Sequence, residues 1–164
     1  MLARFGTTND PAIAERTAKV CLLTQVAPAE LAEANRLAEL AVTGGSTSPW
    51  LAYFQSVKGL AEYRQGHFAS AAEWTQKALA RPGADDQRDV QASMVLAMAQ
   101  QQMNQTKEAR ATLATGCELA RTKLPMINST DLGWDWQGVL IANILMREAQ
   151  GLIEGDKTGV QKTP

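Results

Sequence analysis

Few side chains in this 164-residue chain could do chemistry, since it has one histidine and two cysteines. His67 has no nucleophile or acid placed near it in the sequence, and a general base needs one. Cys21 and Cys117 are too few and too far apart for a disulfide framework or a zinc site, so we expect both to be small buried apolar side chains. The sequence also lacks His-x3-His and Cys-x2-Cys pairs and a glycine-rich phosphate loop. We therefore expect no catalytic residue, no metal site and no cofactor.

The segment Asp131-Leu132-Gly133 superficially resembles the magnesium-binding Asp-Phe-Gly element of protein kinases. Kinase activity also requires a glycine-rich loop, a strand lysine and a His-Arg-Asp loop, and none of these accompanies it. We interpret the segment as a turn at a helix start, where aspartate is a preferred capping residue. The prediction is that the chain is not an enzyme.

Composition and charge exclude several classes of protein. Apolar residues make up 45% of the chain, which is too many for a disordered protein, and the net charge of -1 comes with no basic stripe for a nucleic acid. The longest strongly apolar run, Val139 to Met146, includes Asn143 and is far too short to span a bilayer. Met1 to Pro11 has no apolar signal core, so we expect a cytoplasmic protein with no membrane partner.

Capping and breaking residues divide the chain into seven helix-length pieces. Asp10-Pro11 and Ser48-Pro49 each join a capping side chain to a proline at the first helical position, and Thr106 is expected to cap the sixth helix. Gly66 and Asn104, which tolerate a left-handed turn, end the third and fifth pieces. The other boundaries are expected at Pro28, Gly44-Gly45, Pro82-Gly83, Asp85-Asp86, Leu124-Pro125, residues 129–131 and Ile153.

Apolar residues recur in these pieces at helical spacing and predict one buried face per helix. Residues 155–164 are polar without periodicity and predict a flexible tail after a single domain at 1–154. The predicted buried faces include Ile13, Ala14, Thr17, Ala18 and Cys21; Leu31, Ala34, Ala38, Ala41 and Val42; Trp50, Phe54, Val57 and Ala61; Phe68, Ala71, Thr75, Ala78 and Leu79; Ala92, Val95, Leu96, Ala99 and Met103; Ala109, Leu113, Gly116 and Ala120; and Trp134, Ile141, Leu145, Ala149 and Leu152.

One pattern repeats along the chain. The residues from Gly59 to Leu79 match those from Ala97 to Cys117 at an offset of 38, and Ala34 to Val42 match Ala71 to Leu79 at an offset of 37. A period of this size in helical sequence indicates stacked helical hairpins. The spacing of the best-matched copy resembles a tetratricopeptide repeat: Gly59-x3-Tyr63-x2-Gly66-x-Phe68-x2-Ala71-x6-Ala78-Leu79-x2-Pro82.

This resemblance implies an all-α, right-handed solenoid of antiparallel helix pairs, with about three repeats and a C-terminal capping helix. A narrower resemblance covers residues 10 to 153 and is to the repeat region near the C-terminus of large bacterial serine/threonine protein kinases. It implies a scaffold or regulatory module in bacterial signalling. The segments that carry it are Ala14-Glu15-Arg16-Thr17-Ala18-Lys19 with Cys21-Leu22-Leu23, Trp50-x2-Tyr53-Phe54-Gln55, Lys58 to Gly66, and Asp131-Leu132-Gly133-x-Asp135-Trp136.

The resemblance also implies a binding surface, because the first helix of each tetratricopeptide pair lines a concave face. Arg16 and Lys19 could extend this face, and Tyr63 and the methionines could instead complete the core between repeats. We expect the face to take a peptide or protein segment with apolar anchors. The candidate partner-binding residues are Tyr53, Ser56, Leu60, Tyr63, Arg64, Gln91, Met94, Met98, Gln101 and Gln102.

The last helix supports a different hypothesis. It is apolar around much of its circumference, so either it caps the third repeat or two chains pair through it as a homodimer. A third alternative is a sensor that binds a small ligand or peptide in the concavity. The apolar residues that raise the question are Trp134, Trp136, Val139, Leu140, Ile141, Ile144 and Leu145.

Overall fold

The computed structural model describes residues 1–24, 27–81 and 85–155. These residues are all-helical and contain no strand, which confirms the predicted fold class at this level. The helices are α1 (Leu2–Phe5), α2 (Pro11–Leu22), α3 (Pro28–Gly44), α4 (Leu51–Arg64), α5 (Phe68–Leu79), α6 (Asp86–Gln102), α7 (Thr106–Lys123) and α8 (Trp136–Glu154).

Two of the predicted helix starts have side-chain caps, of which the sequence analysis predicts the one at Asp10. The Asp10 carboxylate accepts hydrogen bonds from the backbone N–H groups of Ala12 at 2.8 Å and Ile13 at 3.0 Å. The Asp85 carboxylate accepts one from the N–H of Arg88 at 2.7 Å. Each cap satisfies N–H groups that have no partner within the helix, which fixes where α2 and α6 begin.

The predicted helix ends at Gly66 and Asn104 are also confirmed. Both residues are left-handed, with φ of 81° and 61°. Asn104 is the only residue other than glycine with a positive φ among those described, and asparagine tolerates this conformation better than most side chains. The predicted boundary at Pro82-Gly83 lies outside the described residues.

Other predictions need correction. The sequence predicts a helix opening at Ser48-Pro49, but α4 begins at Leu51, because the Ser48 hydroxyl accepts a hydrogen bond from the N–H of Trp50 at 3.1 Å and holds a turn there. Thr106 is the first residue of α7 and not its cap. The four-residue helix α1 is not predicted at all.

The start of the last helix is also later than predicted. The Asp131 carboxylate accepts a hydrogen bond from the N–H of Gly133 at 2.7 Å, and Gly133 is left-handed with φ of 79°. This turn reverses the chain before the helix, so α8 begins only at Trp136. The residues predicted for buried faces that are instead exposed are Ile13, Trp50, Trp134 and Leu152.

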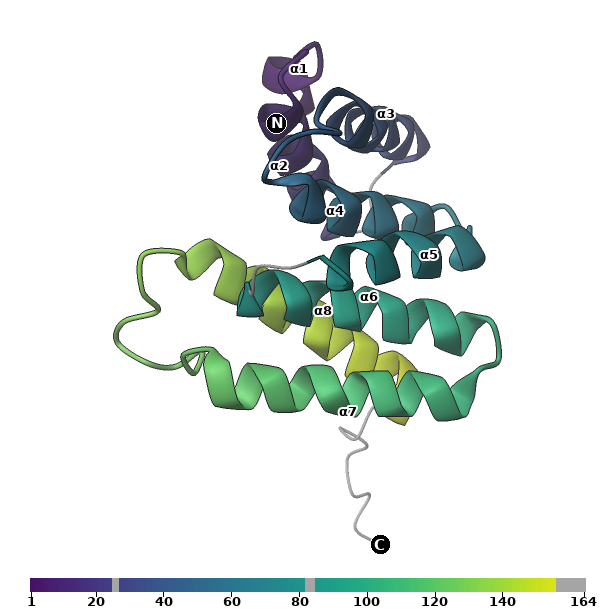
Figure 1. The fold of residues 1–164 in the computed structure, drawn as a ribbon, viewed down its shortest axis with the longest axis vertical. Coiled ribbons are helices and arrows are strands. Elements are labelled where there is room, and N and C mark those ends of the chain that lie inside the picture. Colours follow the sequence, from purple (N-terminus) through teal and green to yellow (C-terminus); the bar gives the residue numbers. More distant parts are fainter. Residues whose placement is uncertain (25–26, 82–84, 156–164) are drawn as a thin grey trace, which may run out of the picture.

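The helices form two layers (Figure 1). α2, α4, α6 and α8 each pack against the next member of this series and form the first layer. α3, α5 and α7 form the second layer, and each packs against the first-layer helices that precede and follow it. The short helix α1 packs on α2 and α3.

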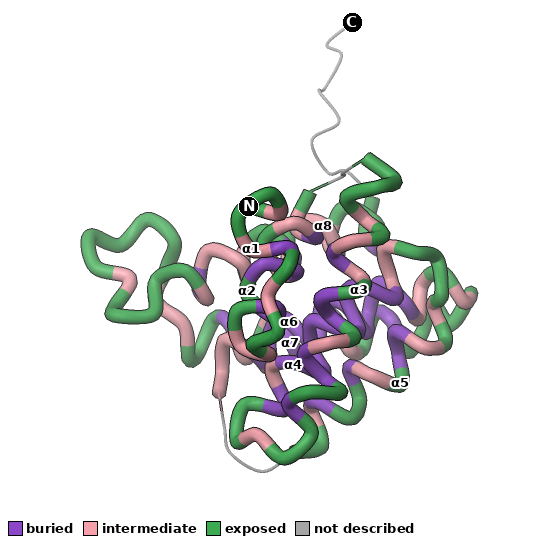
Figure 2. Tube along the Cα trace, turned by 90° about the horizontal axis from the view of Figure 1, so that it is seen from above, coloured by how far each residue is buried: buried purple, intermediate pink, exposed green. Residues whose placement is uncertain are grey.

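Close packing between the layers depends on small residues. A Cβ added to Gly59 of α4 would lie 2.5 Å from Cγ2 of Thr75 in α5. Thr75 is fully buried, and its hydroxyl donates to the Ala71 carbonyl at 2.8 Å. The runs 54–62 of α4 and 90–99 of α6 are buried on every side. Figure 2 shows the buried residues gathered where the helices adjoin, with exposed loops around them.

Candidate functional site

The ten predicted partner-binding residues all lie on α4 and α6 in the first layer. α2 packs against α4 and α8 packs against α6, so much of the expected groove is covered from within the chain. One contact of this kind is the Gln91 side chain, whose Nε2 donates to the Gly138 carbonyl of α8 at 3.0 Å. The buried members complete the core and have little surface left for a partner: Ser56, Leu60, Gln91, Met94 and Met98.

Arg64, predicted to face the partner, is engaged by three helices. Its Nε donates to the Leu22 carbonyl at the end of α2, at 2.8 Å. Its guanidinium also makes a two-pronged ion pair with Glu148 of α8, one contact of which measures 2.7 Å. Its carbon Cζ lies 5.5 Å from the centre of the Tyr63 ring, which packs in turn on Phe68. Arg64 therefore ties α2, α4 and α8 together.

Tyr53 is held by contacts at the other end of α4. Its hydroxyl donates to the Asp85 carboxylate, and the Lys19 and Arg88 cations lie 5.8 Å and 5.6 Å from the ring centre. Burial and the Asp85 carboxylate raise the pKa of Tyr53 well above its ordinary value, so the phenol stays neutral. Lys19 also pairs with Glu15 at 2.5 Å. Tyr53 thus joins α2, α4 and α6 by polar contacts.

Part of the first layer stays accessible. Val20 of α2 is 45% exposed, and sequence analysis missed it because an isolated valine carries no signal. It lies one helical turn after the exposed Arg16, on the same side of α2, and is next in the chain to Lys19, which meets Tyr53. The term "inner surface" is used below for Arg16, Lys19, Val20, Tyr53, Tyr63, Gln101 and Gln102, which are exposed or half-buried.

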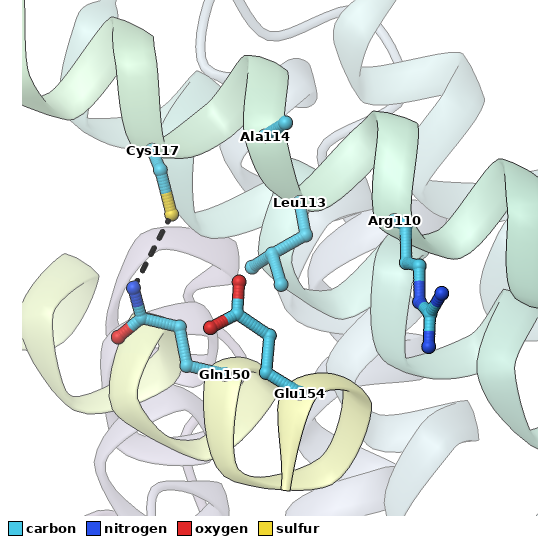
Figure 3. A pocket seen from close by; sticks show the side chains of 6 residues that line it. All are labelled: Arg110, Leu113, Ala114, Cys117, Gln150 and Glu154. Carbon is cyan, nitrogen blue, oxygen red and sulfur yellow. Dashed lines mark hydrogen bonds between the residues drawn. The ribbon is translucent and has the colours of Figure 1, made fainter. Parts of the chain in front are cut away.

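A hollow lies between α7 and α8 (Figure 3). It is an open cleft of about 440 Å³, in which Gln150 Nε2 donates to Cys117 Sγ at 3.6 Å. Burial raises the pKa of the Cys117 thiol, so the thiol is protonated at neutral pH and is a poor nucleophile. Cys21 and Cys117 are half-buried, less than expected. The lining residues of the cleft are Arg110, Leu113, Ala114, Cys117, Gln150 and Glu154.

The remaining candidate catalytic residue is His67. His67 is exposed at the turn before α5, and its Nδ1 lies 3.0 Å from a carboxylate oxygen of Glu62. Across residues 1–24, 27–81 and 85–155, no group of three His, Cys, Asp or Glu side chains could hold a metal ion. In the same residues, every helix is too short or too polar to cross a membrane.

Large apolar side chains are exposed in the segment that joins α7 to α8 and along α8 itself. Trp134 is 99% exposed and Trp136 is 48% exposed. Ile144, two turns further along α8, is 44% exposed. Large exposed apolar patches on soluble proteins mark sites of interaction, so this region is a second candidate surface.

Comparison with known proteins adds no relative. No family model, curated protein or solved structure matches the sequence.

Proposed function

We propose that this chain is a tetratricopeptide-like interaction module, which binds a segment of another protein on its inner surface and does no catalysis. The observation that carries the proposal is the repeated packing unit. Gly66 and Asn104 are both left-handed and lie 38 residues apart, which is the offset of the sequence repeat. Each follows a first-layer helix and precedes the second-layer helix that pairs with it. Stacked units of this kind place equivalent faces side by side, where an extended surface can receive a ligand.

The side chains of the inner surface suit a protein segment with an apolar anchor. Val20 offers an exposed aliphatic contact, and the half-buried Tyr53 and Tyr63 supply aromatic area that is already held in place. Preorganised aromatic residues bind with little loss of side-chain entropy. Gln101 and Gln102 add amides that can pair with a peptide backbone.

The resemblance to the repeat region of bacterial kinases supports a regulatory or scaffold role in signalling for the same surface. Such a role needs no catalytic group in this chain. It needs a surface that keeps its shape while a partner comes and goes. The Arg64 and Tyr53 contacts supply that rigidity, because they fix α2, α4, α6 and α8 relative to one another.

The test is capture of partners from an extract of the source cell with three forms of the chain. Val20→Glu places a charge on the inner surface, whereas Ile144→Glu makes the same kind of change on the exposed face of α8. We expect a protein that is retained by the wild type and by Ile144→Glu and is lost from Val20→Glu. Peptides that tile this protein should then identify one segment whose affinity falls at least about tenfold with Val20→Glu.

Identical retention by all three forms would contradict binding at the inner surface. Thermal unfolding of the variants controls for folding, since both positions are exposed and should tolerate the change within about 0.5 kcal/mol.

A further inference from the structure

The junction between α7 and α8 is open, whereas the equivalent junction between α5 and α6 is closed. In both places a second-layer helix meets the first-layer helix that follows it. Between α5 and α6, the buried Ala71 and Ala72 pack with Leu96 and Ala99 in one apolar cluster. Between α7 and α8 lies the cleft of about 440 Å³. The same arrangement of helices therefore leaves a space at one junction that it fills at the other.

The sequence repeat shows which side chains differ between the two junctions. At the offset of 38, the buried Ala72 corresponds to Arg110, and the half-buried Leu79 corresponds to Cys117. An arginine cannot enter the close apolar contact that an alanine makes, because burying a charge without a partner costs free energy. The α8 wall is polar as well, since it carries Gln150 and Glu154. These polar residues keep the junction open.

The cleft combines both signs of charge with an apolar wall (Figure 3). Arg110 and Leu113 line it from α7, and Gln150 and Glu154 line it from α8. Arg110 is exposed and forms no ion pair within the described residues. Leu113 and Ala114 form the apolar part of the α7 wall. The lining thus offers a ligand one cation, one carboxylate and one amide beside apolar contact.

We propose that the cleft between α7 and α8 binds a short zwitterionic peptide with apolar side chains, of the size of a dipeptide. The carboxylate of the ligand pairs with the Arg110 guanidinium, which can donate two parallel hydrogen bonds to it. The ammonium of the ligand pairs with the Glu154 carboxylate, and the peptide group bonds to the amide of Gln150. An apolar side chain of the ligand lies against Leu113 and Ala114.

Size and charge both favour this class of ligand. Sites for small molecules usually measure roughly 300–1,000 Å³, and the cleft lies in the lower part of this range. An extended dipeptide holds its two charges about 7 Å apart, which suits charged groups on two separate walls. A purely anionic ligand would be repelled by Glu154, and a purely cationic one by Arg110. A zwitterion avoids both repulsions.

The experiment is calorimetric titration of the full chain with the dipeptide leucyl-leucine, with its N-acetylated form and with its C-terminal amide. We expect the free dipeptide to bind with a dissociation constant of about 0.1–1 mM, which is the affinity that the usual ligand efficiency gives for a molecule of this size. Each blocked form should bind at least about fivefold more weakly, because it lacks one of the two ion pairs.

Three variants assign the parts of the ligand to the walls of the cleft. Arg110→Gln should bind the free dipeptide no better than its amide, because the carboxylate has lost its partner. Glu154→Gln should likewise lose the preference for the free ammonium over the acetylated form. Ala114→Trp fills the cleft from an exposed position on its wall, so it should abolish binding of all three compounds.

Arg121→Gln and Val20→Glu are the controls and should leave dipeptide binding unchanged. Arg121 lies on α7 about 16 Å along the helix from Arg110 and pairs with Glu118, and Val20 lies on the inner surface. All five altered residues are exposed, so thermal unfolding should show that every variant folds. A wild type that does not bind leucyl-leucine would overturn the proposal. So would binding that Arg110→Gln, Glu154→Gln and Ala114→Trp retain unchanged.

Discussion

The first-layer helices α4 and α8 occupy equivalent positions but have opposite exposures. α4 is enclosed by α2, α3, α5 and α6, and its residues 54–62 are all buried. α8 packs on α6 and α7 and pairs with Arg64 of α4 through Glu148, but it keeps Trp136 and Ile144 exposed. Both helices are apolar enough to be core. The difference teaches that the number of neighbours, rather than composition, decides whether such a helix acts as core or as surface.

The two helices also differ in the size of the side chains that they carry. α4 carries Gly59 and Ala61 where its neighbours come closest, and small residues allow helix axes to approach. The exposed face of α8 includes the bulky side chains of Trp136 and Ile144 instead. Three predictions test this contrast between α4, which is enclosed by its neighbours, and α8, which has one buried and one exposed face.

The largest effect is expected from two adjacent residues of α8. Leu145→Ala empties a site that is 2% exposed and should lower the free energy of unfolding by about 2–5 kcal/mol. Ile144→Ala removes atoms that already meet water in the single chain, so we expect a loss of less than about 1 kcal/mol. Urea unfolding measures both losses. Equal losses would mean that the two faces of α8 are not distinct.

The next effect compares two glycines. Gly59→Ala places a methyl group 2.5 Å from Thr75 Cγ2 and 3.3 Å from the backbone of α5, so α4 and α5 must move apart. We expect a loss of about 1–3 kcal/mol. Gly151→Ala meets nothing and gains helix propensity, so it should stabilise the folded chain by up to about 1 kcal/mol.

Urea unfolding also measures the change in the free energy of unfolding for the two glycine variants. A stable Gly59→Ala protein would show that α4 and α5 are not in close contact.

Much of the fold follows from local sequence. Asp10 and Asp85 cap their helices, and Gly66 and Asn104 end theirs, because a cap or a left-handed turn depends on residues within one helical turn. The late start of α8 could not be read in the same way. Asp131-Leu132-Gly133 is compatible with a helix cap or with a separate turn, and only the folded chain distinguishes them.

The candidate site was harder to predict than the fold. Helical spacing predicts Met94 and Met98 on the inner face, but both are buried, and the methyl group of Met94 lies against Gly116 of the second-layer helix α7. The Arg64–Glu148 pair, 84 residues apart, is a contact of the same long-range kind. Nothing in the sequence marks Val20 as a residue of the inner surface, because only the folded chain shows its neighbour Lys19 against the Tyr53 ring.

The smallest effect on stability is expected from a buried charged residue of α4, the enclosed helix. Glu62 of α4 is buried, and its carboxylate lies 2.6 Å from Lys58 Nζ and 3.0 Å from His67 Nδ1. Burial by itself would raise the pKa of Glu62, but the hydrogen bonds and charge of Lys58, with the His67 contact, outweigh it and hold the pKa below its ordinary value. The unfolded chain therefore binds a proton at this residue at higher pH than the folded chain does.

The contribution of Glu62 to the stability of the folded chain therefore depends on pH. The stabilisation by Glu62 is fully present above the unfolded-state pKa of about 4.3 and is lost as the pH falls below it. Glu62→Gln removes this contribution, so its deficit against the wild type should be largest at pH 6 and should shrink towards pH 3. Urea unfolding across this range measures the deficit. Glu118→Gln on α7 is the control, because Glu118 pairs with Arg121 at the exposed surface and its small effect should vanish in high salt. A Glu62→Gln deficit that stays constant with pH would instead assign the loss to packing, and the charge buried in α4 would then contribute nothing of its own.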